Sequence, residues 1–234
     1  MSARVRCIVC SVGIVAVFVV LLSFTYMMSM PNFTDSERYL SIPIEASGAS
    51  NRVAGIYLNT RLFDTLIEIL VFSVAVLGVR YYLRHSPKVT LPRLSESAVV
   101  RTAAGILGPL ALLLSAYFAV LGHLSPGGGF AAGVIAASAV LYVAIAQGMA
   151  ATEARFSPQR IAAAEKGILL LLFVWVLLPL AFGEAPLSEL LPPGTPGRLL
   201  SAGSILPYNL LISVKVFFGA WLIIAAFAQH RGDL

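Results

Sequence analysis

The longest uncharged stretch of the chain limits what the chain can fold into. No Asp, Glu, Lys or Arg occurs between Arg101 and Glu153. A helix crosses a bilayer with about 20 apolar residues, so this stretch is long enough for two crossings and must turn between them. Pro126 and the three glycines that follow it supply the turn. We therefore predict two membrane spans here, at about Val100–Gly122 and Gly129–Met149.

Four further apolar runs predict spans of the same kind. They lie at about Val9–Met30, Val53–Leu83, Gly167–Phe182 and Pro207–Ala228. The composition agrees, because 59% of the residues are hydrophobic and 12% are charged, against about 25% charged residues in soluble domains. Uninterrupted runs of this length exclude the alternating strands of a membrane barrel. The expected fold is all-α: a polytopic membrane bundle of about six transmembrane helices.

The positions of the basic residues predict how the helices are oriented. Lys and Arg in short loops favour the cytoplasm. Six spans place most of them on one side, in segments 1–8, 80–101, 155–166 and 231–234, and leave Arg38, Arg52 and Arg198 on the other. We expect both termini to be cytoplasmic in a multi-pass protein of a prokaryotic plasma membrane. The formal net charge of +5 is explained by this bias, so we expect no nucleic acid partner.

Charged side chains inside the second predicted span are the first candidates for an ion pathway. Arg61, Asp64 and Glu68 are spaced i, i+3 and i+7, so on a helix they share one face, with Thr65 beside them. A charge within a span costs about 2.5–3.5 kcal/mol on insertion scales and normally faces a bundle interior or a water-filled cavity. A carboxylate there can carry a proton or bind a cation. The alternative is that all three residues lie at the headgroup level, with Arg61 snorkelling and Asp64 capping the helix.

Lys215 lies near the middle of the sixth predicted span. An ammonium group at that depth must pair with a carboxylate, line a hydrated cavity or lose its proton. Asp64 and Glu68 are the carboxylates that we predict inside spans of this chain, and acidic residues of neighbouring subunits are equally suitable partners. Two interpretations stay open. Lys215 either helps to couple proton movement to a cation route or forms a structural ion pair between two helices.

The turn between the third and fourth predicted spans carries a compact motif. Its residues are His123, Pro126, Gly127, Gly128 and Gly129. Glycines after a proline give a sharp outer turn whose amide groups are free for an ion or a partner, although a plain interhelical turn is the simpler interpretation. Gly129, Gly133 and Ala137 repeat at i, i+4 and i+8, a spacing that predicts close packing against a neighbouring helix.

This motif resembles that of a known family. His123 followed by Pro126–Phe130 between two apolar helices is similar to the B subunit of Mrp-type multisubunit Na⁺/H⁺ antiporters (MnhB or MrpB), over about 97–228. The segment at about 50–85 resembles the C-terminal part of the antiporter's A subunit and a small membrane subunit of membrane-bound hydrogenase-type complexes. Arg61 and the run Asp64–Glu68 carry this second likeness. The expected organisation is a two-helix segment, 1–90, joined by a basic linker to a four-helix domain, 91–234.

The resemblances imply a membrane subunit of a multisubunit cation/proton antiporter module that contributes to the cation or proton route, with Na⁺ as the expected cation. The implied partners are other antiporter-type membrane subunits in a hetero-oligomeric complex, hydrogenase-like redox subunits of a respiratory or sulfur-reducing complex, and the lipid bilayer. A non-conducting structural anchor of such a redox complex is the alternative. We expect no catalytic residue, metal site or cofactor on this chain, because it shows no nucleophile–base pair, metal-ligand cluster or nucleotide loop. Na⁺ and H⁺ are the expected transported ions.

Overall fold

The computed structural model describes residues 47–85, 98–185 and 187–230, and every regular element within these residues is helical. Five helices are long and apolar enough to cross a membrane. They are α4 (Leu62–Leu83), α5 (Ala98–Leu121), α6 (Gly129–Gln147), α8 (Pro158–Leu177), which continues into the 3-10 helix η3 (Leu178–Phe182), and α9 (Ile205–His230). The predicted all-α membrane fold is confirmed. The first predicted span, at about Val9–Met30, lies outside the described residues.

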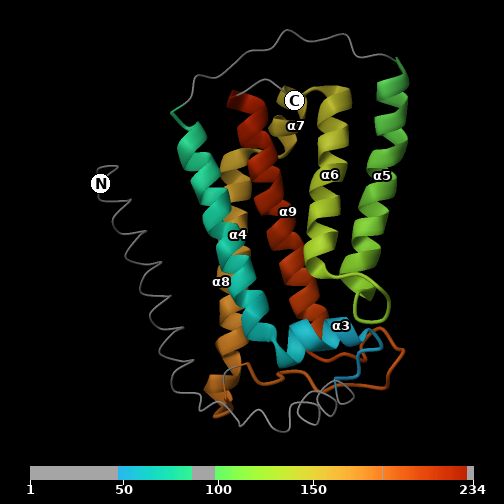
Figure 1. Ribbon diagram of the computed structural model, residues 1–234, viewed down its shortest axis with the longest axis vertical. Helices are drawn as coiled ribbons and strands as arrows, with labels where there is room; N and C mark the ends of the chain where they lie inside the picture. The colour runs from blue at the N-terminus through green and yellow to red at the C-terminus, as the bar shows by residue number, and fades with distance from the viewer. Residues whose placement is uncertain (1–46, 86–97, 186, 231–234) are drawn as a thin grey trace. The chain divides into compact units, whose positions relative to one another are not determined.

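The second predicted span is interrupted near its start. A short helix, α3 (Arg52–Gly55), leads into one π-helical segment, η2 (Ile56–Thr60), and α4 begins only at Leu62. The amide of Arg61 donates to the carbonyl of Ile56, five residues back, at 2.7 Å. Figure 1 shows α3 lying across the end of the bundle and α4 rising from it. Asp64 and Glu68 therefore belong to the first two turns of α4, and Arg61 directly precedes this helix.

The fifth span begins earlier than the predicted Gly167. α8 begins at Pro158, directly after Ser157, and proline is favoured in the first turn of a helix because its missing N–H would have no helical partner there. The candidate span consequently runs over Pro158–Phe182. The stretch from 167 to 182 alone would be short of the roughly 20 residues that a crossing needs. This extension brings Glu165 into the membrane-spanning part of the chain.

α9 is the central helix of the bundle. It packs against α4, α5, α6 and α8, while α5 and α6 form an antiparallel hairpin (Figure 1). The segments 47–61, 122–128 and 187–204 gather at one end of the bundle (Figure 1). The short helix α7 (Met149–Arg155) lies at the other end with the last turn of α4 and the first turn of α5. The helices thus alternate in direction as the loop charges require, and the sidedness itself stays a prediction.

Close contact between α6 and α9 depends on glycine. A Cβ atom added to Gly133 would lie 2.6 Å from the carbonyl oxygen of Ser213, and one added to Gly129 would lie 2.5 Å from the carbonyl oxygen of Asn209. Ala137, one turn further along α6, is buried. Small residues at this spacing let two helix backbones approach closely. The i, i+4, i+8 stripe therefore lies in this helix contact.

Candidate functional site

Lys215 and Glu165 form a buried ion pair in the middle of the bundle. Lys215 Nζ on α9 lies 3.2 Å from Glu165 Oε1 on α8, and the two side chains are 0% and 6% exposed. The same ammonium group donates to the backbone carbonyl of Ile69 on α4 at 3.3 Å. It also lies 4.6 Å from the centre of the Phe72 ring, within the range of a cation–π contact. One ammonium group thus connects three membrane-spanning helices.

The carbonyl of Ile69 accepts two side-chain hydrogen bonds. Besides Lys215, the hydroxyl of Ser73 donates to it at 2.8 Å. Around these groups lie buried apolar side chains, including Leu172 of α8 and Val216 of α9. A charged pair in such surroundings interacts strongly because the local dielectric constant is low.

Lys215 pairs with a residue that we did not name. The sequence left Asp64, Glu68 and acidic residues of neighbouring subunits open as partners, but the structure pairs Lys215 with Glu165. We did not consider Glu165 because the sequence places it next to Lys166 at the edge of an apolar run. Within the helix, Glu165 is buried while Lys166 is exposed.

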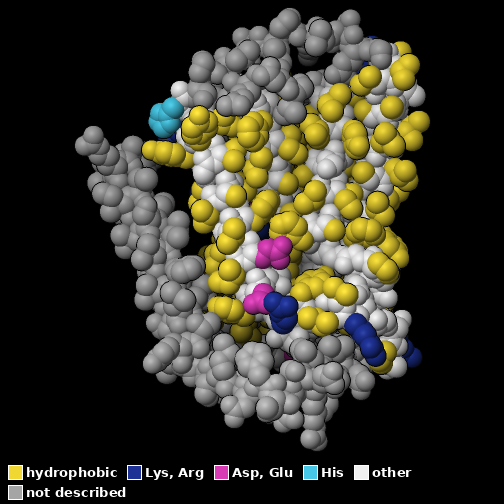
Figure 2. All heavy atoms as spheres, viewed as in Figure 1, with side chains coloured by type: hydrophobic (Ala, Val, Ile, Leu, Met, Phe, Trp, Pro, Cys, Tyr) yellow, Lys and Arg dark blue, Asp and Glu magenta, His cyan; other side chains and the backbone are white. Residues whose placement is uncertain are grey.

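Arg61, directly before α4, and Asp64 and Glu68, within it, are all exposed. The expectation that they face the interior of this bundle is therefore wrong for the described part of the chain. Figure 2 shows acidic and basic side chains beside one another on an otherwise largely apolar face. The inward face of α4 is occupied instead by buried apolar side chains. These are Leu62, Leu66, Ile69 and Val76.

The four pathway candidates on this segment differ in their contacts. Arg61 Nε donates to Asp64 Oδ2 at 2.6 Å, so these two charges balance each other. Asp64 is in the first turn of α4, and the N-cap residue of this helix, Arg61, makes no side-chain capping hydrogen bond. Thr65 is buried and donates to the carbonyl of Tyr57 at 2.6 Å. Glu68 has no ion-pair partner among the described residues.

Tyr57 connects the α4 charges to the glycine turn. Its hydroxyl is buried and has no hydrogen-bond partner within the described residues. A Cβ atom on Gly128 would lie 2.7 Å from this hydroxyl, so any larger residue there would push the Tyr57 side chain aside. Burial and, to a smaller extent, the negative charge of Glu68 raise the pKa of Tyr57. The two sequence motifs therefore meet at one tyrosine.

Two asparagines hold the glycine turn. Asn51 Nδ2 donates to the carbonyls of Gly122 and Ser125 at 2.7 and 2.9 Å. Asn209 Oδ1 accepts from the amide of Gly129 at 2.5 Å, and its Nδ2 donates to the carbonyl of Ala119 at 2.9 Å. The amide of Gly129 is thus not free for an ion, which favours the simpler interpretation of a plain interhelical turn. Sequence reasoning missed Asn51, although an asparagine directly before a helix is a recognised capping residue and Asn51 does cap α3.

His123 is buried completely within this end of the bundle. Neither ring nitrogen has a partner at hydrogen-bonding geometry among the described residues. Burial lowers the pKa of His123, and nearby backbone groups of Arg198, Leu199 and Val120 offset this only in part. Of the motif, Pro126 is exposed and Gly127 is half-buried. The turn is therefore a closed, hydrogen-bonded structure around a neutral histidine.

Comparison with known proteins gives matches to membrane proteins, both in sequence and in fold. The sequence model of a family described as a domain related to the MnhB subunit of the Na⁺/H⁺ antiporter matches residues 99–222. No curated protein matches the chain.

Two solved membrane complexes contain chains of the same fold. One chain belongs to the membrane-bound sulfane sulfur reductase, an archaeal respiratory membrane complex, at 24% identity and a TM-score of 0.67, with 97% of this chain and 100% of that chain covered. The other belongs to the Mrp complex of Dietzia sp. DQ12-45-1b, also at 24% identity and a TM-score of 0.67. All of this chain matches there, but it spans only 27% of that longer chain.

Proposed function

We propose that this chain, which belongs to the family of domains related to the MnhB subunit of the Na⁺/H⁺ antiporter, contributes to the ion route of a cation/proton antiporter module. It is a multi-pass membrane subunit of an Mrp-type, antiporter-like complex of a prokaryotic membrane. Na⁺ is the proposed cation. The proposed partners are other antiporter-type membrane subunits, joined by redox subunits where the module is part of a sulfur-reducing or hydrogenase-like complex.

The buried pair of Lys215 and Glu165 carries the proposal. Two charges removed from water cost several kcal/mol each before their attraction is counted, and apolar side chains of similar volume would hold three helices together at least as well. A pair retained at this depth therefore supports a role beyond packing. We assign it to the proton side of the exchange, in which Lys215 holds a proton that Glu165 can accept.

Glu68 is the proposed cation-side residue. It lies on α4 one position before Ile69, whose carbonyl accepts the hydrogen bond from Lys215. A cation bound by Glu68 on the outer face of α4 would thus be one residue away from the buried pair along the same helix. In this proposal the cation moves along the exposed surface of α4 and not through the centre of the bundle. The Tyr57 hydroxyl lies between Glu68 and the glycine turn.

A structural anchor that carries no ion is the second candidate function. The observation that favours it is the number of helices held by Lys215, because a residue that connects α4, α8 and α9 stabilises the bundle whether or not it conducts. The two functions differ in what they require of Glu68. A cation route needs the Glu68 carboxylate to bind the transported ion, whereas an anchor needs no residue that binds one.

The variant Glu68→Gln tests the proposal, since glutamine has nearly the same shape without the charge. Transport is measured as Na⁺-dependent collapse of a pH gradient in membrane vesicles that contain the complete complex. We expect Glu68→Gln to impair exchange while the complex still assembles. Glu184→Gln, the same change at an exposed loop residue, is the matched control and should transport normally. Normal exchange by Glu68→Gln would favour the anchor.

A further inference from the structure

The exposed face of α4 changes character along its length. Glu68, Val71, Ala75, Gly78 and Tyr82 follow one another at helical spacing, and all five are exposed. Such residues form one continuous face of a helix. This face carries a charged side chain near the start of α4, the small residues Ala75 and Gly78 further along, and a groove near the end of the helix.

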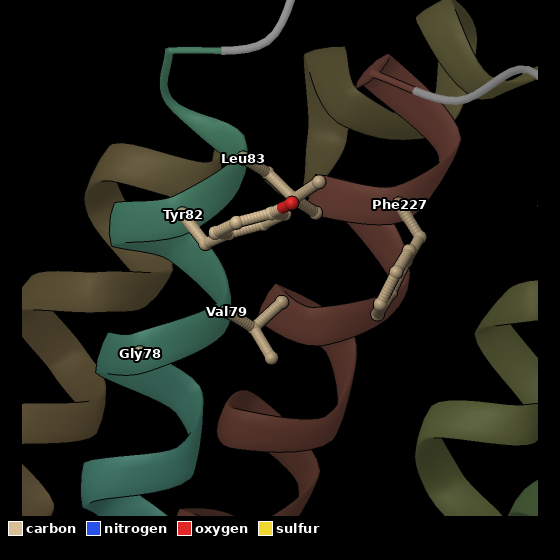
Figure 3. Close-up of a pocket in the computed structure, with 5 residues that line it drawn as sticks. All are labelled: Gly78, Val79, Tyr82, Leu83 and Phe227. Atoms are coloured by element: carbon tan, nitrogen blue, oxygen red, sulfur yellow. The ribbon is translucent and has the colours of Figure 1, made fainter.

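The hollow is a groove between α4 and α9 with a volume of about 370 Å³. Its lining residues are Gly78, Val79, Tyr82, Leu83 and Phe227. Figure 3 shows Val79 and Tyr82 of α4 and Phe227 of α9 around this space. Gly78 leaves it open, because an added Cβ atom there would meet no other atom within 4 Å. The groove is apolar and lies on the same face of α4 as Glu68.

Glu68 is the unbalanced charge on this face. It stands six residues after the start of α4, which at 1.5 Å per residue is about 9 Å into the helix. Asp64 is neutralised by Arg61, but Glu68 pairs with no described residue. A carboxylate that faces lipid at this depth is costly, and intramembrane charges normally have a partner of opposite sign.

We propose that this face of α4 docks a membrane-spanning helix of a different subunit, which places a Lys or Arg opposite Glu68 while no cation is bound there and an apolar side chain in the groove. The two contacts are 10 to 14 residues apart on α4, or about 15–21 Å, so the partner helix carries its basic and bulky residues at the same spacing. A lipid chain could fill the groove but could not neutralise Glu68. A symmetric second copy would bring one Glu68 towards another, which is repulsive.

This inference rests on the proposed role as one subunit of a complex, and its test reads assembly rather than transport. Gly78→Trp fills the groove, while Gly105→Trp places the same side chain at an exposed glycine of α5 that also has no atom near its missing Cβ. The complete complex is purified with a tag on this chain. We expect Gly78→Trp to lower the yield of at least one other membrane subunit about tenfold, which corresponds to 1.4 kcal/mol, and Gly105→Trp to leave it unchanged. Equal retention in both variants would overturn the proposal.

The identity of the neighbour is tested by a photo-crosslinking amino acid in place of Val71, next to Glu68 on this face. The expected adduct joins Val71 to a membrane-spanning helix of another subunit that contains Lys or Arg. An adduct with a second copy of this chain, or with lipid alone, would contradict it. Glu68→Lys gives a second measurement, since reversal of the charge should release the same neighbour, whereas normal transport by Glu68→Gln would argue only against the cation route.

Discussion

Lys215 of α9 and Glu165 of α8 lie 3.2 Å apart, with both side chains almost completely removed from solvent. Neither charge can be removed alone without leaving the other buried and unpaired. Breaking such a pair costs about 3–5 kcal/mol, whereas replacing both members by apolar groups is often neutral. A comparison of single and double replacements can therefore distinguish a role in ion conduction from a role in helix packing.

Lys215→Met alone should destabilise the subunit, because Glu165 is then left in an apolar core without its ion-pair partner. The double variant Lys215→Met with Glu165→Leu should recover assembly but not exchange, if the pair handles protons. Both variants are compared for subunit composition and for Na⁺-dependent collapse of a pH gradient. Recovery of exchange together with assembly in the double variant would mean that the pair is structural.

His123 predicts a pH dependence. Its pKa is lowered in the folded chain from an ordinary value of 6.5, so below about pH 6.5 the unfolded chain binds more protons than the folded one. Stability should therefore fall as the pH drops through that range and should be insensitive to this residue above it. The thermal midpoint of the purified complex between pH 8 and pH 5 measures the effect. His123→Gln, which cannot titrate, should have a flatter profile, and an unchanged profile would rule out His123 as the source.

Gly133→Ala should weaken the contact between α6 and α9. The added methyl group would lie 2.6 Å from the Ser213 carbonyl, so one backbone must shift, at a cost of about 1–3 kcal/mol. Gly105→Ala is the control, because its methyl group meets no neighbour and alanine favours the helix. Thermal unfolding in detergent should separate the two variants. Equal midpoints would show that the helices can part without loss.

The sidedness of the chain is tested at the glycine turn. Ser125 is half-buried beside Pro126, and a cysteine there should react with a membrane-impermeant thiol reagent added to intact cells. The native Cys7 and Cys10 are first changed to serine so that they do not contribute to labelling. Labelling of Ser125→Cys only after the membrane is opened would reverse the predicted topology.

The positions of the helices could be predicted from the sequence, but not which side of each helix is buried. Hydropathy and charge give the number of described spans and most of their ends to within a few residues, since α5 and α6 begin and end close to the predicted positions. In a soluble helix the polar side would also reveal which face is outward. In a membrane helix both faces are apolar, so nothing in the pattern distinguishes the buried Leu66 from the exposed Val71.

The pairing of Lys215 could not be predicted for a related reason. Charged residues define where an apolar run stops, and Glu165 and Lys166 together mark such a stop. The pairing becomes visible only when α8 and α9 are placed side by side, because the two partners are far apart in the chain. The role of the glycine stripe of α6 was easier to predict, because small residues at this spacing indicate close helix packing without knowledge of the partner helix.

The π-helical segment at Ile56–Thr60 sets the phase of α4. Each residue of a helix advances the side chains by about 100°, so one residue more or less in this segment would rotate every later side chain of α4 about the helix axis. Ile67 or Ile69 would then occupy the direction that Glu68 now takes, and the carboxylate would point towards a different neighbour. The length of this π-helical segment, to a single residue, thus determines which surface of α4 faces the neighbouring subunits.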